Sequence, residues 1–238
     1  MNFLAHASSS AGNAYTVTED GCAPLLVECG LPRQQLQRAL EFKTSGLAGC
    51  LISHHHGDHA RALGYVACAG VDCYMSVGTA AALGVRSHRI HQVEPRRRFD
   101  VGPWQVMPFD LRHDAGGTLG FLIASPAGDR LLYACDTAYV PYRFEGLTHV
   151  AIEANYGAEM LRASELDPEQ KKRVIRNHMS IERALDMLAA NDLSAVRAIW
   201  LLHLSDSNSD ERAFKTAVEA ATGKPTHVAP ARSTGAAA

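Results

Sequence analysis

A cluster of side chains that can bind metal directly follows a buried strand in this sequence. The segment SHHHGDHA, residues 53–60, holds four histidines and one aspartate in eight positions. The preceding run LAGCLIS (47–53) is almost wholly apolar and has the length of a buried strand. Histidine tracts that bind metal adventitiously are usually terminal and mobile, whereas this one is attached to a strand end. The chain must therefore fold so that this strand end lies at the rim of a sheet.

The spacing within the cluster divides its side chains into two pairs. Side chains alternate on an extended backbone, so His54 and His56 would share one side of the chain while His55 points to the other. Asp58 and His59 follow where the chain turns into a helix. The spacing predicts two adjacent pairs of ligands and leaves the middle histidine of the triplet out.

Three candidate ligands outside the cluster lie at the ends of predicted strands. Two imidazoles do not complete a metal shell of about four to six ligands. His113 follows a strand and precedes a glycine-rich turn, while Asp136 and His203 each end an apolar strand, where an unpaired carboxylate is costly to bury. Taken singly, such a histidine is more often a hydrogen-bonded core residue and such an aspartate a turn or cap residue. Ligands at several strand ends are nonetheless what a metal site at the rim of a sheet requires.

The order of the apolar runs predicts a mixed α/β sandwich. Strands come first with few helices, and a helix–strand–helix run closes the chain. The predicted strands span residues 22–29, 47–53, 71–75, 104–111, 119–125, 130–136, 147–155 and 195–205, and the predicted helices span 31–43, 180–190 and 209–222. No low-complexity linker divides the chain, so we expect one domain over residues 1–228 and a disordered tail over 229–238.

Composition and charge restrict the environment and the partners of the protein. No run of about 18 apolar residues is present, and the N-terminus lacks the features of a signal peptide, so we expect a cytoplasmic protein with no membrane partner. The net charge of −2 gives no global attraction to nucleic acid, which would need a local basic patch. The six cysteines form no CxxC pair, and we expect buried free thiols.

The histidine cluster and five further segments resemble one family of hydrolases. HHHGDH fits the HxHxDH signature of the metallo-β-lactamase fold hydrolases, and within them nearly the whole chain is most similar to the YycJ (WalJ) group of metal-dependent nucleases. SSSAGNAYTV resembles that group's N-terminal serine- and glycine-rich turn. RHDAGGTLGF, EANYGAEML, NHMSIERAL and LLHLSDSNS are similar to QHDAxxPxxF, ETNYDxEML, GHLSNxxAL and LSHLSxxNN. The last four are more specific than HxHxDH, which occurs in hydrolases of many substrates.

The resemblance implies a four-layer αββα sandwich in a single domain, with two divalent metal ions at one edge. Histidine-rich sites with a bridging carboxylate suit zinc or manganese. The implied ligands are His54, His56 and His113 for one ion, Asp58, His59 and His203 for the other, and Asp136 as the bridge.

Other residues are implied to act around the metals. His178, in NHMS, is similar to the non-ligand histidine that related phosphodiesterases place beside the scissile phosphate, although it could instead cap the helix near residue 180. We expect Asn155, Tyr156 and Arg176 to contact or brace the substrate, and Glu28 and Asp114 to orient the metal ligands.

The sequence departs from the resembled group at three places. Glu28-Cys29-Gly30 stands where Asp-x-Gly is usual after the first buried strand, which alters the support of the cluster. Asn177 replaces a glycine before His178, and Thr137-Ala138 replace Ile-Gly after the bridging aspartate. None of these changes removes an implied ligand.

A two-metal site suggests hydrolysis of a phosphodiester. Two ions about 3.5–4 Å apart can share a water, lower its pKa towards about 7 and clamp the phosphate oxygens, so that hydroxide attacks phosphorus. Asp58 could ligate or orient that nucleophile. His178 could donate a hydrogen bond to the phosphate or a proton to the departing oxygen.

Several substrates are compatible with such a site. Basic residues gather in SHRIHQVEPRRR (87–98) and EQKKRVIRNH (169–178), which suits a polyanion but also an ordinary solvated face. We expect a DNA exonuclease. The alternatives are a hydrolase of cyclic nucleotides or other small phosphodiesters, as in phage anti-defence members of this fold, a lactone or thioester hydrolase, and an inactive binding scaffold. A homodimer is compatible with the sequence, which does not define the oligomeric state.

Overall fold

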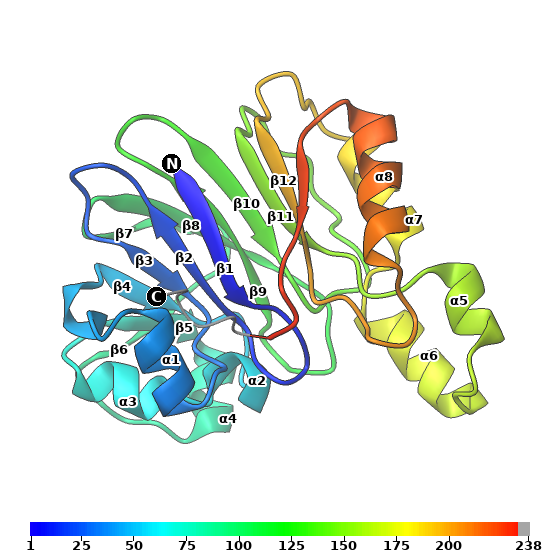
Figure 1. Ribbon diagram of the computed structural model, residues 1–238. Helices are drawn as coiled ribbons and strands as arrows, with labels where there is room; N and C mark the ends of the chain where they lie inside the picture. Colours follow the sequence, from blue (N-terminus) through cyan, green and yellow to red (C-terminus); the bar gives the residue numbers. More distant parts are fainter. Residues whose placement is uncertain (233–238) are drawn as a thin grey trace.

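The computed structural model describes residues 1–232, in which two β-sheets pack face to face (Figure 1). The first sheet has the strand order β1-β2-β3-β4-β5-β6. Its strands are β1 (Asn2–Ala7), β2 (Ala14–Thr18), β3 (Leu25–Val27), β4 (Gly49–Leu51), β5 (Cys73–Ser76) and β6 (Ile90–Val93). The second sheet has the order β13-β12-β11-β10-β9-β8-β7. Its strands are β7 (Phe99–Val101), β8 (Trp104–Asp110), β9 (Leu119–Ala124), β10 (Arg130–Ala134), β11 (His149–Glu153), β12 (Ala198–Leu202) and β13 (Thr226–Val228).

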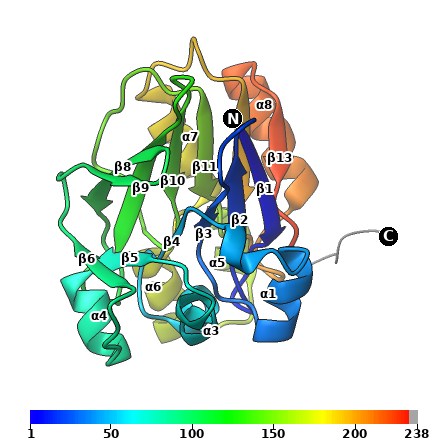
Figure 2. The same cartoon turned by 90° about the vertical axis from the view of Figure 1, so that its left-hand side faces the viewer.

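Helices cover the outer face of each sheet (Figures 1 and 2). Those over the first sheet are α1 (Arg33–Ala39), α3 (Leu63–Cys68) and α4 (Val77–Leu83), with the 3-10 helix η1 (Thr44–Gly46) between α1 and β4. Those over the second sheet are α7 (Ile181–Ala189) and α8 (Glu211–Thr222). The short helix α2 (Gly57–Ala60) follows β4, while α5 (Ala158–Ala163) and α6 (Pro168–Asn177) extend beyond the second sheet at the lower right of Figure 1.

Alternation along the strands divides the apolar side chains among three layers. In β3, Leu25 packs between the sheets and its neighbour Leu26 packs under the helices of the first sheet. In β12, Leu202 lies between the sheets and Leu201 packs under α7 and α8. All four side chains are fully buried, and each such burial stabilises the fold by about 1.5–3 kcal/mol. Because both sheets are covered on both faces, the predicted αββα sandwich in a single domain is confirmed.

The observed elements differ from the predicted ones mainly at the edges of the sheets. Each predicted strand overlaps one observed strand, and the predicted helices correspond to α1, α7 and α8. The sequence did not predict β1, β2, β6, β7, β13 or the helices α3 to α6, so the first half of the chain is more helical than expected. Helix α6 is strongly polar and was interpreted only as a basic segment. Its start nevertheless carries a capping box between Asp167 and Gln170, a local signal that identifies a helix.

The described chain remains packed beyond residue 228. The Ala229 amide donates a hydrogen bond to Leu201 O at 2.9 Å, and the Ser8 amide donates to Pro230 O at 2.8 Å. Ala229 is buried in the core between the sheets. Residues 229–232, which the sequence analysis placed in the expected tail, are therefore part of the packed structure, and residues 233–238 lie outside the described residues.

The cysteines are free thiols, as expected, but not all are buried. Cys29, Cys50, Cys73 and Cys135 are buried, whereas Cys22 is half-buried and Cys68 is exposed. Among the helices of residues 1–232, none is long and apolar enough to cross a membrane.

Candidate metal centre

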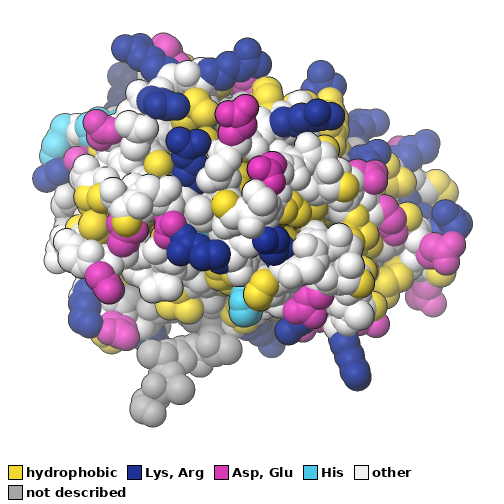
Figure 3. Space-filling model, turned by 90° about the horizontal axis from the view of Figure 1, so that it is seen from above, with side chains coloured by type: hydrophobic (Ala, Val, Ile, Leu, Met, Phe, Trp, Pro, Cys, Tyr) yellow, Lys and Arg dark blue, Asp and Glu magenta, His cyan; other side chains and the backbone are white. Residues whose placement is uncertain are grey.

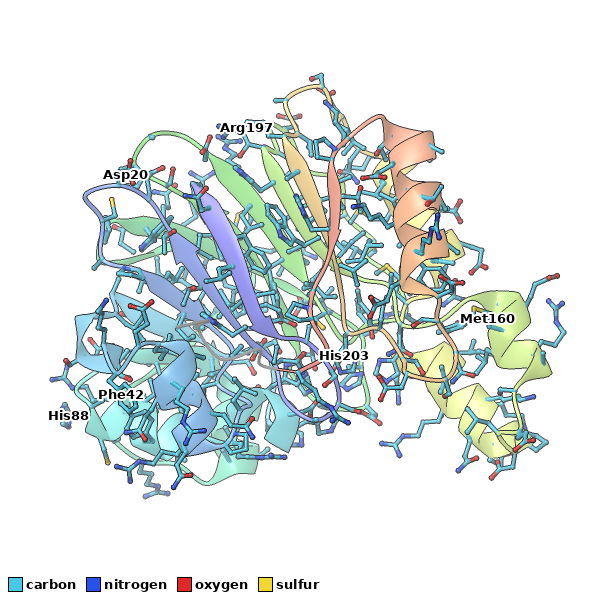
Figure 4. The ribbon with its side chains drawn as sticks, in the orientation of Figure 1. Asp20, Phe42, His88, Met160, Arg197 and His203 are labelled. Atoms are coloured by element: carbon cyan, nitrogen blue, oxygen red, sulfur yellow. The ribbon has the colours of Figure 1, made fainter. Side chains whose placement is uncertain are left out.

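Strands from both sheets end at one edge of the sandwich and bring the candidate ligands there. β10, β11 and β12 are parallel neighbours, and β8 runs the same way because β8 and β10 both pair antiparallel with β9. The end of β4 lies beside them, since the Leu119 amide donates to Ser53 O at 3.0 Å. Figure 4 shows His203 at this edge, at the lower end of the sheets. Side chains far apart in the sequence are therefore collected at one place.

The first group of donor atoms comes from three histidines and one aspartate. His54 Nε2 lies 3.0 Å from His56 Nδ1, which lies 3.3 Å from His113 Nε2. Asp136 Oδ2 lies 3.5 Å from His54 Nε2 and 4.0 Å from His113 Nε2. These four side chains can offer ligand atoms that all lie within 4.8 Å of one another. His55 belongs to none of the ligand groups found in residues 1–232, and its ring packs against His56 with 5.0 Å between centroids.

The second group shares Asp136 with the first. Asp58 Oδ2 lies 3.4 Å from His59 Nε2 and 3.5 Å from His203 Nε2. Asp136 Oδ2, the same atom that faces the first group, lies 2.9 Å from His59 Nε2. The structure thus brings together all seven side chains that the sequence singled out as ligands.

The donor set fits divalent metal ions. Nε2 of His203 is buried and has no hydrogen-bond partner among the described residues, although leaving such an atom unpaired is unfavourable. A neutral imidazole carries only one N–H, so the close nitrogens of His54, His56 and His113 cannot satisfy one another fully. Imidazole nitrogen and carboxylate oxygen are the ligands that zinc and manganese bind. These residues can therefore hold metal.

The charges at the site favour ionised aspartates and a neutral His54, but not every ligand is in the form that binds metal. Burial acts to raise the pKa of the Asp136 carboxyl, but the charges of His203 and His59 outweigh it and hold that pKa well below its usual value. Burial likewise acts to raise the pKa of the Asp58 carboxyl, but the neighbouring His203 and His59 outweigh it and hold that pKa well below its usual value. Burial and the neighbouring His59 both lower the pKa of His54. The aspartates are ionised and His54 is neutral, as ligation requires. Burial acts to lower the pKa values of His59 and His203, but the charge of Asp136 outweighs it and raises both, so each ring must release a proton to ligate an ion.

Three residues at this edge adopt a left-handed backbone that is unusual for non-glycine residues. They are Glu28 with φ of 62°, Asp136 with φ of 52° and His203 with φ of 54°, each one or two residues beyond a strand. Such conformations cost on the order of 1–3 kcal/mol each and gather at functional sites. The rest of the fold therefore holds these three residues in a backbone conformation that non-glycine residues disfavour.

Helix α2 is held against the first sheet by backbone contacts that require a glycine. A Cβ atom on Gly30 would lie 1.6 Å from Asp58 O. The Cys29 amide donates to His59 O at 2.8 Å, and the Asn13 amide donates to Asp58 O at 2.7 Å. Asn13 is fully buried, and its Nδ2 lies 3.3 Å from Asp58 Oδ2 and 3.1 Å from His59 Nε2. Asn13 was not predicted from the sequence.

Glu28 lies behind His59, where it can orient that ring. Its Oε1 lies 3.4 Å from His59 Nδ1 and accepts a hydrogen bond from the Tyr133 hydroxyl at 3.1 Å. The Ser53 amide also donates to the same carboxylate, at 3.2 Å. Glu28 is fully buried, so these contacts replace water around its charge.

Asp114 connects the first ligand group to helix α6. Its Oδ1 lies 3.1 Å from His113 Nε2 and 3.7 Å from His56 Nε2. Its Oδ2 accepts hydrogen bonds from Asn177 Nδ2 at 2.8 Å and from Arg173 Nη2 at 3.4 Å. Asn177, one of the departures from the resembled group, thus has a defined contact.

His178 pairs with a buried glutamate that the sequence did not single out. His178 Nδ1 lies 2.6 Å from Glu153 Oε1, and the Thr137 and Met179 amides donate to Glu153 Oε2 at 3.0 Å and 3.2 Å. Burial acts to lower the pKa of His178, but the charge of Glu153 outweighs it and raises the pKa to about 10. Glu153 ends the apolar strand HVAIE, so the reasoning applied to Asp136 could have found it.

The alternative structural role of His178 does not match its position. His178 ends helix α6, and Ser180 caps the next helix by accepting a hydrogen bond from the Arg183 amide at 3.3 Å. The side chain of His178 instead faces Asp136, with 3.6 Å between Nδ1 and Oδ1.

A cleft of about 320 Å³ opens over the ligands. It is lined by His56, Asp58, His113, Asp136, His178 and His203, and by Gln170, Arg173 and Val174 of α6. Arg176 is exposed on α6 and does not line this cleft, so Arg173 is the α6 arginine that does. Asn155 lines a neighbouring cleft and donates to His203 O at 2.7 Å. Tyr156 is buried and lines neither cleft.

The fold and this site define a metal-dependent hydrolase with the metallo-β-lactamase fold. A family profile described as the Beta-lactamase superfamily domain matches residues 24–204, which include all seven candidate ligands. The chain belongs to that superfamily.

Individual relatives agree with this assignment. The chain is 29% identical over 232 residues to "Exodeoxyribonuclease YycJ" of Bacillus anthracis, covering 90% of this chain and 86% of the relative. It is 29% identical over 220 residues to "Exodeoxyribonuclease WalJ" of Streptococcus pneumoniae, covering 85% and 81%. Among solved structures it is similar in fold to the metallo-beta-lactamase fold protein YhfI from Bacillus subtilis, with a TM-score of 0.71, 16% identity and coverage of 96% and 95%. Human tRNase Z, short form, gives a TM-score of 0.66 at 16% identity, with coverage of 97% and 96%.

Proposed function

We propose that this protein is a dinuclear metal-dependent phosphodiesterase that acts as a DNA exonuclease. The observation that carries the proposal is the position of Asp136 Oδ2, which faces both ligand groups, at 3.5 Å from His54 Nε2 and 2.9 Å from His59 Nε2. One zinc or manganese ion would be held by each group. The proposed ligands are His54, His56 and His113 on one side and Asp58, His59 and His203 on the other, with Asp136 in common.

The two ions would supply hydroxide at neutral pH and offset the charge that develops on the phosphate. The protein holds the surrounding groups in position. Asn13 Nδ2 donates to Asp58 Oδ2 at 3.3 Å, which fixes this carboxylate to ligate an ion or to orient the attacking water. Glu28 and Asp114 act on the histidine rings of the two groups through the contacts described above.

His178 is proposed to deliver a proton to the departing oxygen. It lines the cleft beside Asp136 and His203, and its Nδ1 faces Glu153, which leaves the other ring nitrogen for the substrate. The charge of Glu153 favours the protonated imidazole, which is the form that can act as an acid. Glu153 is therefore a positioning residue for His178.

The surface beside the cleft supports a nucleic acid substrate. Helix α6 carries Lys171, Lys172, Arg173 and Arg176, and Arg173 lines the cleft itself. Cationic side chains next to the scissile phosphate attract a polyanion and hold its backbone. The two curated relatives are named exodeoxyribonucleases, which favours DNA among the polyanions.

The proposal is tested by a cleavage panel with the metal-loaded protein. One arm uses end-labelled double-stranded and single-stranded DNA, and the other uses cyclic mononucleotides and bis(p-nitrophenyl) phosphate, each with zinc and with manganese. Asp58→Ala serves as the matched control, because it removes a ligand. Stepwise shortening of DNA that this variant abolishes is the expected result.

The other outcomes identify the alternatives. Hydrolysis of the cyclic or small diesters with DNA left intact would make the protein a small-phosphodiester hydrolase. No hydrolysis in either arm would contradict phosphodiester chemistry, and lactone and thioester substrates would be tested next. No hydrolysis of those substrates would indicate a binding scaffold.

A further inference from the structure

A second pocket, distinct from the metal cleft, gathers arginines from three separate segments. Its volume is about 580 Å³. Arg38 comes from the last turn of α1, Arg61 follows α2, and Arg232 lies beyond β13, at the end of the described chain. Figure 2 shows α1 next to the part of the molecule where the described chain ends. Three arginines that are distant in sequence thus line one pocket.

The arginine pocket, defined by Arg38, Arg61 and Arg232, is linked to the metal cleft through a third cleft. This third cleft has a volume of about 350 Å³. It shares Ser10, Val174, His178 and His203 with the metal cleft, and Ala11, Ala231 and Arg232 with the arginine pocket. The loop around Ser10 therefore forms a common wall from the metal ligands to the arginines.

The arginine pocket carries positive charge that the described residues do not neutralise. Within residues 1–232, no ion pair joins any of its three arginines to a carboxylate, and no acidic residue lines it. The connecting cleft contains one acidic residue, Asp206. Figure 3, which views the molecule from above, shows basic and acidic side chains interspersed over the opposite end. An uncompensated group of arginines in a pocket favours an anion with several oxygen acceptors, and arginine binds phosphate particularly well.

We infer that the arginine pocket binds a backbone phosphate of a nucleic acid strand whose scissile phosphate lies at the metal ligands. The inference rests on the proposed function and extends it, because it assigns a subsite for a second phosphate and so a requirement for a polynucleotide. A strand passing the metal cleft would continue along the Ser10 loop into the pocket. A small diester would not reach the arginines, so the pocket favours longer substrates.

The test compares Arg38→Gln, Arg232→Gln and the double variant with wild type. These side chains are exposed, so the fold should survive, whereas Arg61 adjoins the ligand helix and is left unchanged. Arg143→Gln is the matched control. Like the pocket variants, it removes one exposed positive charge, but at a different place. The neighbouring Phe144 amide donates to Asn191 Oδ1, just beyond the end of α7.

Binding is measured separately from hydrolysis. Fluorescence anisotropy follows a labelled single-stranded oligonucleotide with phosphorothioate linkages, which resist cleavage, on the metal-loaded protein at several salt concentrations. Each pocket variant should weaken binding about threefold to tenfold and reduce the slope of log K against log salt by about 0.7. The ratio of kcat/KM for the oligonucleotide to that for bis(p-nitrophenyl) phosphate should fall by a similar factor.

Equal losses in Arg143→Gln and in the pocket variants would overturn the inference. The inference would also be overturned if the pocket bound only free phosphate. Calorimetry would then show binding of inorganic phosphate that the pocket variants abolish, while their affinity for the oligonucleotide stayed unchanged. Neither outcome affects the proposed function. That function fails instead if wild type hydrolyses no phosphodiester, whatever the binding data show.

Discussion

Nδ1 of His178 lies 2.6 Å from Oε1 of Glu153 and 3.6 Å from Oδ1 of Asp136. Glu153 is fully buried at the end of β11 and is held by two backbone amides, so it cannot easily move away from the ring. The contact fixes the orientation of the imidazole at the cleft. Together with Asp136 and His203, these two residues form a third group of donor atoms within 4.8 Å of one another, so metal analysis of variants must separate His178 from the seven proposed ligands.

Removal of the His178 imidazole should slow turnover strongly without removing metal. His178→Ala is expected to lower kcat by about 10²–10⁴. Glu153→Gln keeps the shape and removes the charge, so kcat should fall by a smaller factor with KM little changed. Steady-state kinetics with metal analysis of each variant checks both expectations. Loss of an ion in His178→Ala would make His178 a ligand, and unchanged turnover would contradict both roles.

Neighbouring histidines should differ in their effect on metal content. His54→Ala removes a donor of the first group, and we expect it to lower the metal content measured by elemental analysis after dialysis. His55→Ala is the matched control, because His55 belongs to no ligand group in the described residues. Chelation of wild type should also lower the melting temperature, since an ion at 100 times its Kd stabilises the fold by about 2.7 kcal/mol. Equal metal content in the two variants would contradict the proposed ligand set.

A methyl group at Gly30 should displace the helix that carries Asp58. The added Cβ would lie 1.6 Å from Asp58 O, which is too close for any contact, so α2 must shift. We expect Gly30→Ala to cost about 1–3 kcal/mol of unfolding free energy or more, and to weaken metal binding. Gly57→Ala places a methyl in the same helix where no atom lies within 4 Å. Urea unfolding and metal titration should separate the two variants, and similar behaviour would contradict this account of α2.

Stability should fall on acidification because of His149, which is far from the proposed ligands. Its side chain is buried against Trp200, and burial, with the charge of Arg197, lowers its pKa from 6.5 to about 4. The unfolded chain then binds a proton more readily than the folded one. The contribution of neutral His149 to the free energy of unfolding is complete above about pH 6.5 and is lost progressively as the pH falls towards 4.

The measurement is urea unfolding of wild type and His149→Phe at about pH 7 and pH 5. Wild type should lose about 2 kcal/mol more than the variant, since phenylalanine can still stack on Trp200 but does not titrate. Parallel losses in the two proteins would show that His149 is not responsible.

Local sequence patterns predicted a mixed α/β sandwich and pointed to the candidate ligands, whereas the four-layer arrangement was implied by the family resemblance. The apolar runs that became β4, β10 and β12 each end in a polar residue, and alternation alone separated His54 and His56 from His55. These are properties of a few consecutive residues on one strand. They can be read without knowing what the strand packs against.

Other parts of the site depended on contacts between distant segments. Glu28 meets Tyr133 only because the two sheets pack together, and Asn13 reaches Asp58 only because α2 folds back over the end of β3. Arg38, Arg61 and Arg232 line one pocket only because the fold brings their three segments together. No residue spacing encodes such proximity. The sequence by itself determined which side chains leave the strand ends, and only tertiary packing decided which other charges and hydrogen bonds surround them.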